Sequence, residues 1–588
     1  MNETELMMKR FWIWIARLPL FHPVWFNIIL LLLTWSIAGV AFQSNDDLVI
    51  ASVLDGWGDP SYADAHVIFV NPLLTGALLH VSPLLGGVSV WPVFLALSTL
   101  GGSAAMFTIL TMHARKARRY DAHTLLILVL WLLLMPGFYA ALQFSQAAFL
   151  TGGAGVLACF QYGRGSRAGL AAGVALFLLG SMIRLDAALA CGVFWGVMLA
   201  ARSLAGRGSV WLGLREDGRL WAAWCIALVA AFGLHAYSVQ SHRDVLEGCD
   251  IMAWNKVRAV LSDTSPVRSE REYQCGTYGV FANDIKMVRA FTNCDLEVFD
   301  TDYLHRLALA RDGGGFWDGL LARAGKAVDL FSWEAVQDLL PCWILFVLAF
   351  RISSLRGDAA PMRWCVACLL VLILLYMASI DRLYFRVVYP TFLIASLCLL
   401  WNESYRPLRC SWKGKNGVVG SMLTVCAFAL SVSQVYAAVR ESEAWSYSSE
   451  AGRLLCERVE REPDSLFCVH MSGTSIDDLA PGQSIFRKAW SCSRPNVVTL
   501  GGWNFPLKPV QMKLKAMGWQ RQSALNLCRD GVYIVCLVPQ GDVSGMDRQF
   551  FSMLCRYIRE HHGVRVSWKL DENLAGVRIY RLRQINSL

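Results

Sequence analysis

Long apolar runs separated by short polar breaks dominate the chain as far as about residue 440. Apolar runs of about 17–25 residues can cross a hydrocarbon core of roughly 30 Å as helices. The pattern predicts about eleven such transmembrane helices, and so the fold class of an α-helical polytopic membrane protein. We place them at roughly 24–42, 90–111, 124–141, 144–160, 168–184, 187–203, 220–238, 336–351, 364–380, 386–401 and 418–439.

A further apolar stretch, from His66 to Leu85, is interrupted by Asn71-Pro72 and Ser82-Pro83. Proline disfavours a helical conformation in the residue before it, so each X-Pro pair marks a boundary. We expect short helices here that lie at the membrane interface or pack against the bundle.

The pattern changes after about residue 440, where short apolar runs alternate with amphipathic stretches. The apolar runs Leu466–His470, Asn496–Leu500 and Gly531–Val538 predict buried strands, and Val564–Leu570 with Gly576–Leu582 predicts a hairpin. Helices are expected at Pro509–Met517 and Asp547–Glu560. This order predicts a small α/β domain of roughly 140 residues, which is large enough for its own core.

Basic residues gather in alternate short loops, namely Arg115 to Arg119, Arg164 and Arg167, Arg202 to Arg219, Arg351 to Arg363, and Arg406 to Lys415. Lys and Arg are retained on the cytoplasmic side of a membrane. The N-terminus is therefore expected in the cytoplasm, and an odd number of spans places the C-terminal domain outside. Four regions follow: a membrane module over 1–238 with an acidic first outside loop, an extracytoplasmic loop over 239–335, further spans over 336–439, and the extracytoplasmic domain over 440–588.

Composition agrees with a membrane protein: of 588 residues, 55% are hydrophobic and 17% are charged, whereas about 25% are charged in soluble domains. The net charge of +9 is concentrated in loops where topology explains it, so it gives no reason to expect a nucleic acid partner. The chain carries no Walker A motif and no GxSxG motif, so ATP-driven transport and hydrolase chemistry gain no support.

The first outside loop is the strongest candidate for chemistry. The stretch from Gln43 to Ser89 holds no Lys or Arg, and it begins with Asn45-Asp46-Asp47. One of the two carboxylates is suited to act as a general base on an acceptor hydroxyl, while its partner orients it, binds a metal or bonds the acceptor. The structural alternative is that Asn45 or Asp46 caps a helix beginning near Leu48.

Two further clusters of charge lie at predicted outside turns. Arg184 and Asp186 lie between two apolar stretches, where they form either an internal ion pair or a contact to a lipid phosphate or the acidic loop. Asp381-Arg382-Leu383-Tyr384-Phe385-Arg386 departs from the positive-inside rule. Its two guanidinium groups, with Tyr384 between them, suit a phosphate or pyrophosphate, although anchoring to lipid headgroups is the alternative.

Five short motifs together resemble the GT-C superfamily of membrane glycosyltransferases, in particular a poorly characterised bacterial group of multi-spanning proteins. The motifs are Asn45-Asp46-Asp47, Arg184-Leu185-Asp186, Asn255-Lys256-Val257-Arg258-Ala259, Asn283-Asp284, and Asn496 to Trp503. The resemblance implies transfer of a sugar from a polyprenyl-phosphate donor to an extracytoplasmic glycan, cell-wall polymer or lipid acceptor. It implies that Asp46 or Asp47 is the base or a metal ligand, and that Arg382 and Arg386 bind the lipid phosphate. Arg184 is a further candidate for the phosphate, with Asn45, Asp186, Asp381 and Tyr384 in support.

No cofactor is required by this scheme, and a divalent metal on the first-loop carboxylates stays an open alternative. A transporter or flippase of a lipid-linked or anionic substrate is the second functional hypothesis. A charged side chain deep in mid-span would favour it. A non-catalytic assembly protein is the third.

Overall fold

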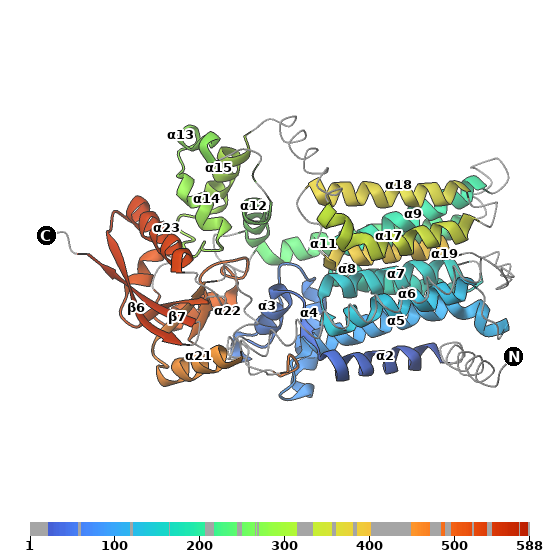
Figure 1. The fold of residues 1–588 in the computed structure, drawn as a ribbon, viewed down its shortest axis with the longest axis horizontal. Helices are drawn as coiled ribbons and strands as arrows, with labels where there is room; N and C mark the ends of the chain where they lie inside the picture. The colour runs from blue at the N-terminus through green and yellow to red at the C-terminus, as the bar shows by residue number, and fades with distance from the viewer. Residues whose placement is uncertain are drawn as a thin grey trace.

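The computed structural model describes residues 22–56, 60–117, 122–163, 165–205, 217–243, 250–264, 266, 270–313, 333–354, 360–379, 385–401, 449–470, 484–487, 496–519, 523–537, 544–574 and 577–585. Long helices fill one end of the molecule, and a mixed part with a β-sheet fills the other (Figure 1).

Helices occupy ten of the eleven predicted spans. They are α2 (Pro23–Ala38), α5 (Val90–Ala117), α6 (Ala122–Ala140), α7 (Phe144–Tyr162), α8 (Arg167–Ile183), α9 (Leu185–Ala205), α11 (Gly218–Arg243), α17 (Trp333–Ser354), α18 (Ala360–Ser379) and α19 (Phe385–Leu400). The eleventh, 418–439, falls where the structure describes no residues. Among the described helices, three stretches are long and apolar enough to cross a membrane: Val90–Met112, Gly218–Arg243 and Met362–Ser379. The other apolar helices are shorter, so the number of crossings stays a prediction.

Helix α7 lies at the centre of this bundle, and every residue from Phe144 to Phe160 is buried. Its glycines let neighbouring backbones approach closely, as is common between membrane helices. A Cβ at Gly155 would lie 2.5 Å from the backbone nitrogen of Phe177 on α8, and a Cβ at Gly180 would lie 2.8 Å from the nitrogen of Gly152. The contact between α7 and α8 therefore depends on glycine at these positions.

Short elements cover the end of the bundle that faces the mixed part. Strand β1 (Ala41–Phe42) pairs in parallel with β2 (Ala141–Leu142), and each leads directly into a helix, α3 (Asn45–Leu54) and α7 respectively. The expectation for residues 66–85 is confirmed as two short helices: α4 (Pro72–Val81), which Asn71 caps by accepting a bond from the Leu73 amide, and η2 (Ser82–Leu85).

The region after α11 contributes four short helices to the mixed part: α12 (Ile251–Asp263), α13 (Cys275–Tyr278), α14 (Ala282–Arg289) and α15 (Thr301–Asp312). Arg311 of α15 is almost fully buried and donates to the carbonyl oxygens of Leu261 and Thr264, at 2.9 and 3.0 Å. These two bonds join α15 to the C-terminal end of α12.

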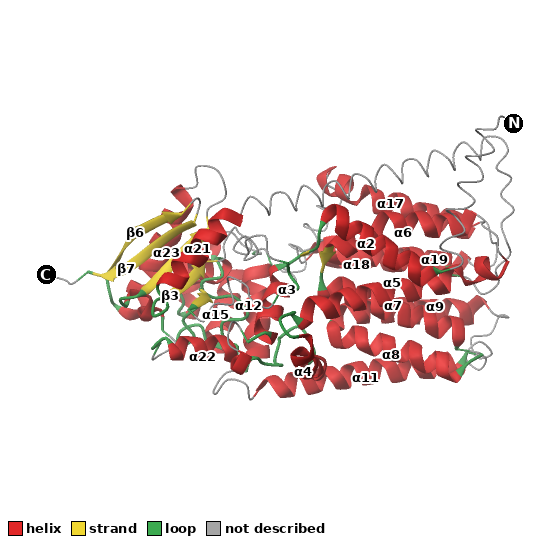
Figure 2. Ribbon diagram, turned by 90° about the horizontal axis from the view of Figure 1, so that it is seen from below, coloured by secondary structure: helices red, strands yellow, loops and turns green. Residues whose placement is uncertain are grey.

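A five-stranded sheet in the order β4-β3-β5-β7-β6 completes the mixed part (Figure 2). Its strands are β3 (Leu466–His470), β4 (Val497–Thr499), β5 (Val532–Leu537), β6 (Val566–Leu574) and β7 (Val577–Gln584). The helices around it are α21 (Ser449–Arg461), α22 (Lys508–Ala516), η8 (Ala524–Cys528) and α23 (Ser544–His562). The strands and helices predicted after residue 440 lie within a few residues of these, and β6 and β7 form the expected antiparallel hairpin. The four domain boundaries stay predictions.

Buried pairs join the two halves of the mixed part. His561 and His562, at the end of α23, contact Asp284 and Asp295, with Nε2–Oδ2 distances of 2.9 and 2.8 Å. Both carboxylates are completely buried. The region between α11 and α17 is thereby fixed to the C-terminal helix.

Candidate functional site

Asp46 and Asp47 lie in the first turn of α3, which begins at Asn45. The alternative in which Asn45 or Asp46 caps a helix starting near Leu48 is wrong, because the helix begins three residues earlier and Ser44 occupies the N-cap position. Both aspartate side chains instead bond to groups from distant parts of the chain.

Asp47 is completely buried and its carboxylate accepts three hydrogen bonds. Ser44 Oγ donates at 2.8 Å, the Phe144 amide at 3.1 Å and Trp91 Nε1 at 3.3 Å. The pairing of β1 with β2 explains the second bond, because it places the start of α3 beside the start of α7. Burial, with a smaller repulsion from Asp46, raises the pKa of Asp47 to about 8, and the three hydrogen bonds only partly oppose this.

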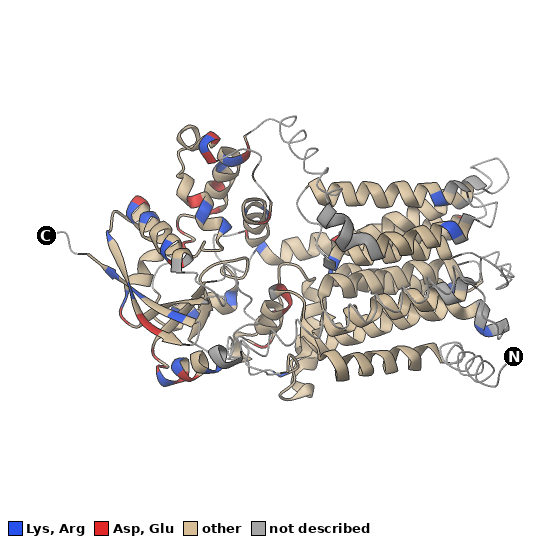
Figure 3. Cartoon of the chain, in the orientation of Figure 1, with Lys and Arg blue, Asp and Glu red and all other residues tan. Residues whose placement is uncertain are grey.

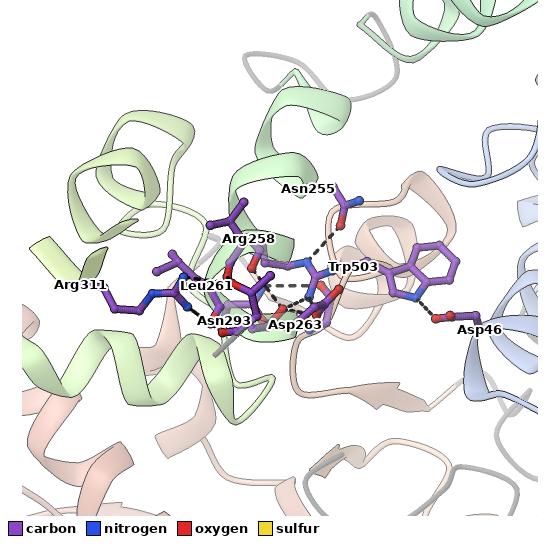
Figure 4. A network of polar contacts seen from close by, with 12 residues as sticks. Asp46, Asn255, Arg258, Leu261, Asp263, Asn293, Arg311 and Trp503 are labelled. Carbon is purple, nitrogen blue, oxygen red and sulfur yellow. Dashed lines mark hydrogen bonds and ion pairs between the residues drawn. The ribbon is translucent and has the colours of Figure 1, made fainter. Parts of the chain in front are cut away.

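Asp46 is half-buried and has a different partner. Trp503 Nε1 donates to Asp46 Oδ1 at 2.9 Å, across 457 positions of sequence (Figure 4). The Trp503 side chain is only 7% exposed. The loop after β4 therefore reaches the start of α3, in the predicted first outside loop, a contact that no local pattern in the sequence indicates.

Aromatic rings connect the carboxylate pair to Arg184. The guanidinium carbon of Arg184 lies 4.8 Å from the ring centroid of Phe144 and 5.5 Å from that of Phe69. The Phe69 ring in turn meets the Trp503 ring edge to face, with centroids 4.9 Å apart. Cation–π contacts thus hold Arg184 near both aspartates. Phe144 links it to Asp47, and Phe69 with Trp503 links it to Asp46.

A pocket of about 580 Å³ opens beside Phe69 and Arg184. Its polar and charged lining comes from Asn71, Ser181, Arg184, Asp186, His235, Ser238, Arg243, Asp250, Asn255 and Lys256. Asp46 and Asp47 are not among the lining residues; the contact of Trp503 with Phe69 joins Asp46 to the pocket wall. The pocket lies between the end of the bundle and α12, so its lining comes from both parts of the molecule.

Asn255 lines this pocket, and a neighbouring side chain fixes its amide group. Its side-chain oxygen accepts a 3.0 Å bond from Arg258 Nε, which is itself almost fully buried (Figure 4). The amide nitrogen consequently points away from Arg258. Sequence reasoning identified this Asn-x-x-Arg spacing as a motif but assigned it no role.

The remaining predicted site residues are only partly brought into this region. Asp186 lines the pocket with an exposed side chain, and Arg386 is half-buried in the first turn of α19. Asp381, Arg382 and Tyr384 belong to the part of the chain that the structure does not describe, as does the side chain of Asn45. An approach of Arg382 or Arg386 to the carboxylate pair therefore stays a prediction.

The described residues contain no group of three or more His, Cys, Asp or Glu side chains arranged to hold a metal ion.

Comparisons with known proteins give a match among solved structures. No protein-family model matches the chain, and no curated protein does. Among solved structures the chain is similar to a crystal structure of ArnT from Cupriavidus metallidurans bound to undecaprenyl phosphate. The match covers 95% of this chain and 97% of ArnT, at 10% identity and a TM-score of 0.39.

Proposed function

We propose that the chain is a membrane glycosyltransferase that moves a sugar from a polyprenyl-phosphate donor to an extracytoplasmic glycan, cell-wall polymer or lipid acceptor. The observation that carries the proposal is the connected cluster at the end of the bundle. It brings together a carboxylate pair, a cation on two aromatic rings and an adjoining polar pocket, all from separate segments of the chain.

Asp46 is the better candidate for the general base. A base must be ionised before it accepts a proton, and a carboxyl group with a pKa of about 8 is roughly nine-tenths protonated at pH 7. Asp47 therefore holds the start of α3 against α7 rather than removing protons. Asp46 is half-buried, and its Oδ1 accepts a bond from Trp503.

In the proposed reaction Asp46 takes the proton of an acceptor hydroxyl while the acceptor oxygen attacks the anomeric carbon of the donor sugar. The bond from that carbon to the lipid phosphate breaks, and the phosphate leaves with the electron pair. Attack opposite the leaving group inverts the anomeric centre. Arg184 stabilises the charge that develops on the phosphate, assisted by Arg382 and Arg386.

The pocket is the proposed place of the donor's polar head. It offers Arg184, Arg243 and Lys256 as cations and the Asn255 amide as a hydrogen-bond donor. Such groups suit a sugar phosphate, which is rich in acceptor oxygens. In this proposal the pocket and the mixed part face the extracytoplasmic side, in agreement with the distribution of Lys and Arg in the loops.

The transporter hypothesis has less support. Along the described bundle helices, Lys, Arg, Asp and Glu lie near the helix ends rather than in mid-span (Figure 3). The feature that would favour a transport path is therefore not found in those helices.

The test compares Asp46→Asn with Asp47→Asn in purified protein supplied with radiolabelled polyprenyl-phosphate sugar and an envelope extract as acceptor. Loss of a general base typically costs about 10²–10⁴-fold in rate, so Asp46→Asn should lose transfer by that order. Asp47→Asn should stay within about tenfold of the wild type at pH 7, because asparagine resembles the protonated carboxyl group. Transfer by Asp46→Asn at the wild-type rate would contradict the proposal, and movement of intact substrate across sealed vesicles would favour a transporter.

A further inference from the structure

The loop after β4 contacts the predicted first outside loop through the bond from Trp503 to Asp46. We infer that Trp503 is a positioning residue: its indole N–H fixes the Asp46 carboxylate, so that the C-terminal part of the chain completes the active site. The inference rests on the proposed function for its catalytic consequence, although the contact itself is independent of it.

The bond restrains rotation of the Asp46 side chain and so fixes the orientation of its carboxylate. A carboxylate on the first turn of a helix otherwise rotates freely unless a partner holds it, and Nε1 holds Oδ1 at 2.9 Å. Only one oxygen is engaged by Trp503, which leaves Oδ2 as the atom able to accept a proton.

Trp503 can act in this way because its own ring is fixed. It packs edge to face on Phe69, which lines the pocket, and its side chain is nearly buried. The indole thus bonds the proposed base at its N–H and contacts the pocket wall through its ring.

The backbone that carries Trp503 is fixed as well. Asn293 clamps Gly502 from both sides: its Oδ1 accepts from the Gly502 amide at 3.1 Å, and its Nδ2 donates to the Gly502 carbonyl oxygen at 3.4 Å. A Cβ on Gly501 would lie 2.4 Å from the carbonyl oxygen of Phe291 and 2.7 Å from the nitrogen of Asn293. Only glycine permits this approach.

The loop opposite Gly501 adopts a backbone conformation that is rarely populated. Phe291, with φ at +52°, has the one positive φ of a non-glycine residue among those described. Such conformations persist where the surrounding structure holds them, and they are frequent near functional sites. The segments around residues 291–293 and 501–503 therefore form a rigid support for the indole.

The decisive variant replaces Trp503 with benzothienylalanine, which keeps the shape and stacking of the indole but has sulfur in place of N–H. The matched control makes the same replacement at Trp35, whose Nε1 donates to the Tyr139 carbonyl oxygen at 2.8 Å in the bundle. Trp503→Phe serves as a second variant that uses natural residues. Each is assayed for kcat, for KM with polyprenyl-phosphate sugar, and for deuterium uptake of peptides covering residues 43–50.

Removing a hydrogen bond to a charged group is expected to lower kcat by about 10–100-fold, with KM unchanged within about threefold. Deuterium uptake over residues 43–50 should rise, because the first turn of α3 loses its contact with Trp503. The Trp35 control should match the wild type in all three measurements.

Two results would overturn the inference. One is unchanged kcat and deuterium uptake in both Trp503 variants. The other is a fall in kcat that is matched by the Trp35 control. If the wild type transfers no sugar, the proposed function fails by itself, and deuterium uptake still decides whether Trp503 fixes the first loop.

Discussion

At the scale of single residues, two adjacent carboxylates acquire different chemistry from their surroundings. Asp47 lies among Ser44, Trp91 and the start of α7 with no exposure to solvent, whereas Asp46 faces Trp503 and is half-buried. Burial disfavours the ionised form of Asp47, and ionised Asp46 adds to this effect. Adjacent carboxyl groups in different surroundings are typical of sites that divide two chemical roles between them.

The raised pKa of Asp47 predicts a specific dependence of stability on pH. The folded-state pKa of about 8 lies above the reference value of 3.8, so the folded protein binds this proton more tightly than the unfolded chain does. The stabilisation from this proton is complete below about pH 4 and is lost as pH rises to about 8. The free energy of unfolding falls by at most about 1.4 kcal/mol for each pH unit in this range. Asp47→Asn removes this titration while keeping an amide able to bond Ser44, Trp91 and Phe144.

Thermal unfolding of the wild type and Asp47→Asn in detergent should therefore diverge with pH. The variant should gain in Tm over the wild type between pH 5 and pH 8, and the difference should stop growing above that range. Asp186→Asn, at an exposed position, should follow the wild type. A constant difference across the range would show that Asp47 does not titrate there.

At the scale of elements, the bundle depends on close contact between α7 and α8. Small residues allow membrane helices to approach, because dispersion contacts replace the hydrophobic effect as the main attraction. Gly155 and Gly173 lie at this contact, where each backbone fills the space that a Cβ of the other helix would take. The first residues of α7 bond Asp47 and carry Phe144 under Arg184, so the position of α7 also determines the geometry of the site.

Gly155→Ala should therefore destabilise the protein although alanine favours helix formation. The added methyl group would lie 2.5 Å from the Phe177 nitrogen and 2.6 Å from the Gly173 carbonyl oxygen, and such overpacking typically costs about 1–3 kcal/mol. Gly101→Ala on α5 is the matched control, since nothing lies within 4 Å of its added carbon. Thermal unfolding should show a lower Tm for Gly155→Ala and an equal or higher Tm for Gly101→Ala. The reverse order would contradict this packing.

At the scale of the whole molecule, sequence patterns predicted the helices and strands better than the contacts between them. Apolar runs and X-Pro boundaries predicted the positions of the described bundle helices and of α4, because hydrophobic burial and proline geometry act locally. The β-hairpin and β3 followed from the same local rules. The sequence also indicated Asp46, Asp47 and Arg184 as candidate site residues, and their part in catalysis stays a prediction.

What the sequence could not predict depends on contacts between distant segments. Nothing near Trp503 indicates that its N–H bonds Asp46, and nothing near Asp47 indicates that Trp91 and the Phe144 amide enclose it. The split between the two aspartates follows from burial, which is a property of the assembled fold. The role of Asn255 likewise requires knowing that Arg258 turns its amide nitrogen away.

The docking of the two halves of the mixed part provides the last prediction. Asp295 is completely buried, and its Oδ2 bonds His562 and the Ala524 amide, while Asp284 bonds His561 and the hydroxyl of Tyr303. Removing one partner of a buried pair typically costs about 3–5 kcal/mol, because the other group stays buried without compensation. Asn293, which clamps the Trp503 loop, lies two residues from Asp295, so this docking also supports the proposed site.

His562→Ala should lower the Tm and should increase deuterium uptake over residues 291–295 and 500–505, the two segments that hold Trp503. The matched control is His80→Ala, at an exposed histidine of α4 that bonds only its own helix, and it should leave both measurements unchanged. A double-mutant cycle with Asp295→Asn separates the pair from general destabilisation, since residues in direct contact should give a coupling of about 0.5–3 kcal/mol. Additive effects of His562→Ala and Asp295→Asn would mean that this pair does not hold the two halves together, and the rigidity of the Trp503 loop would then depend on Asn293 and Gly501 alone.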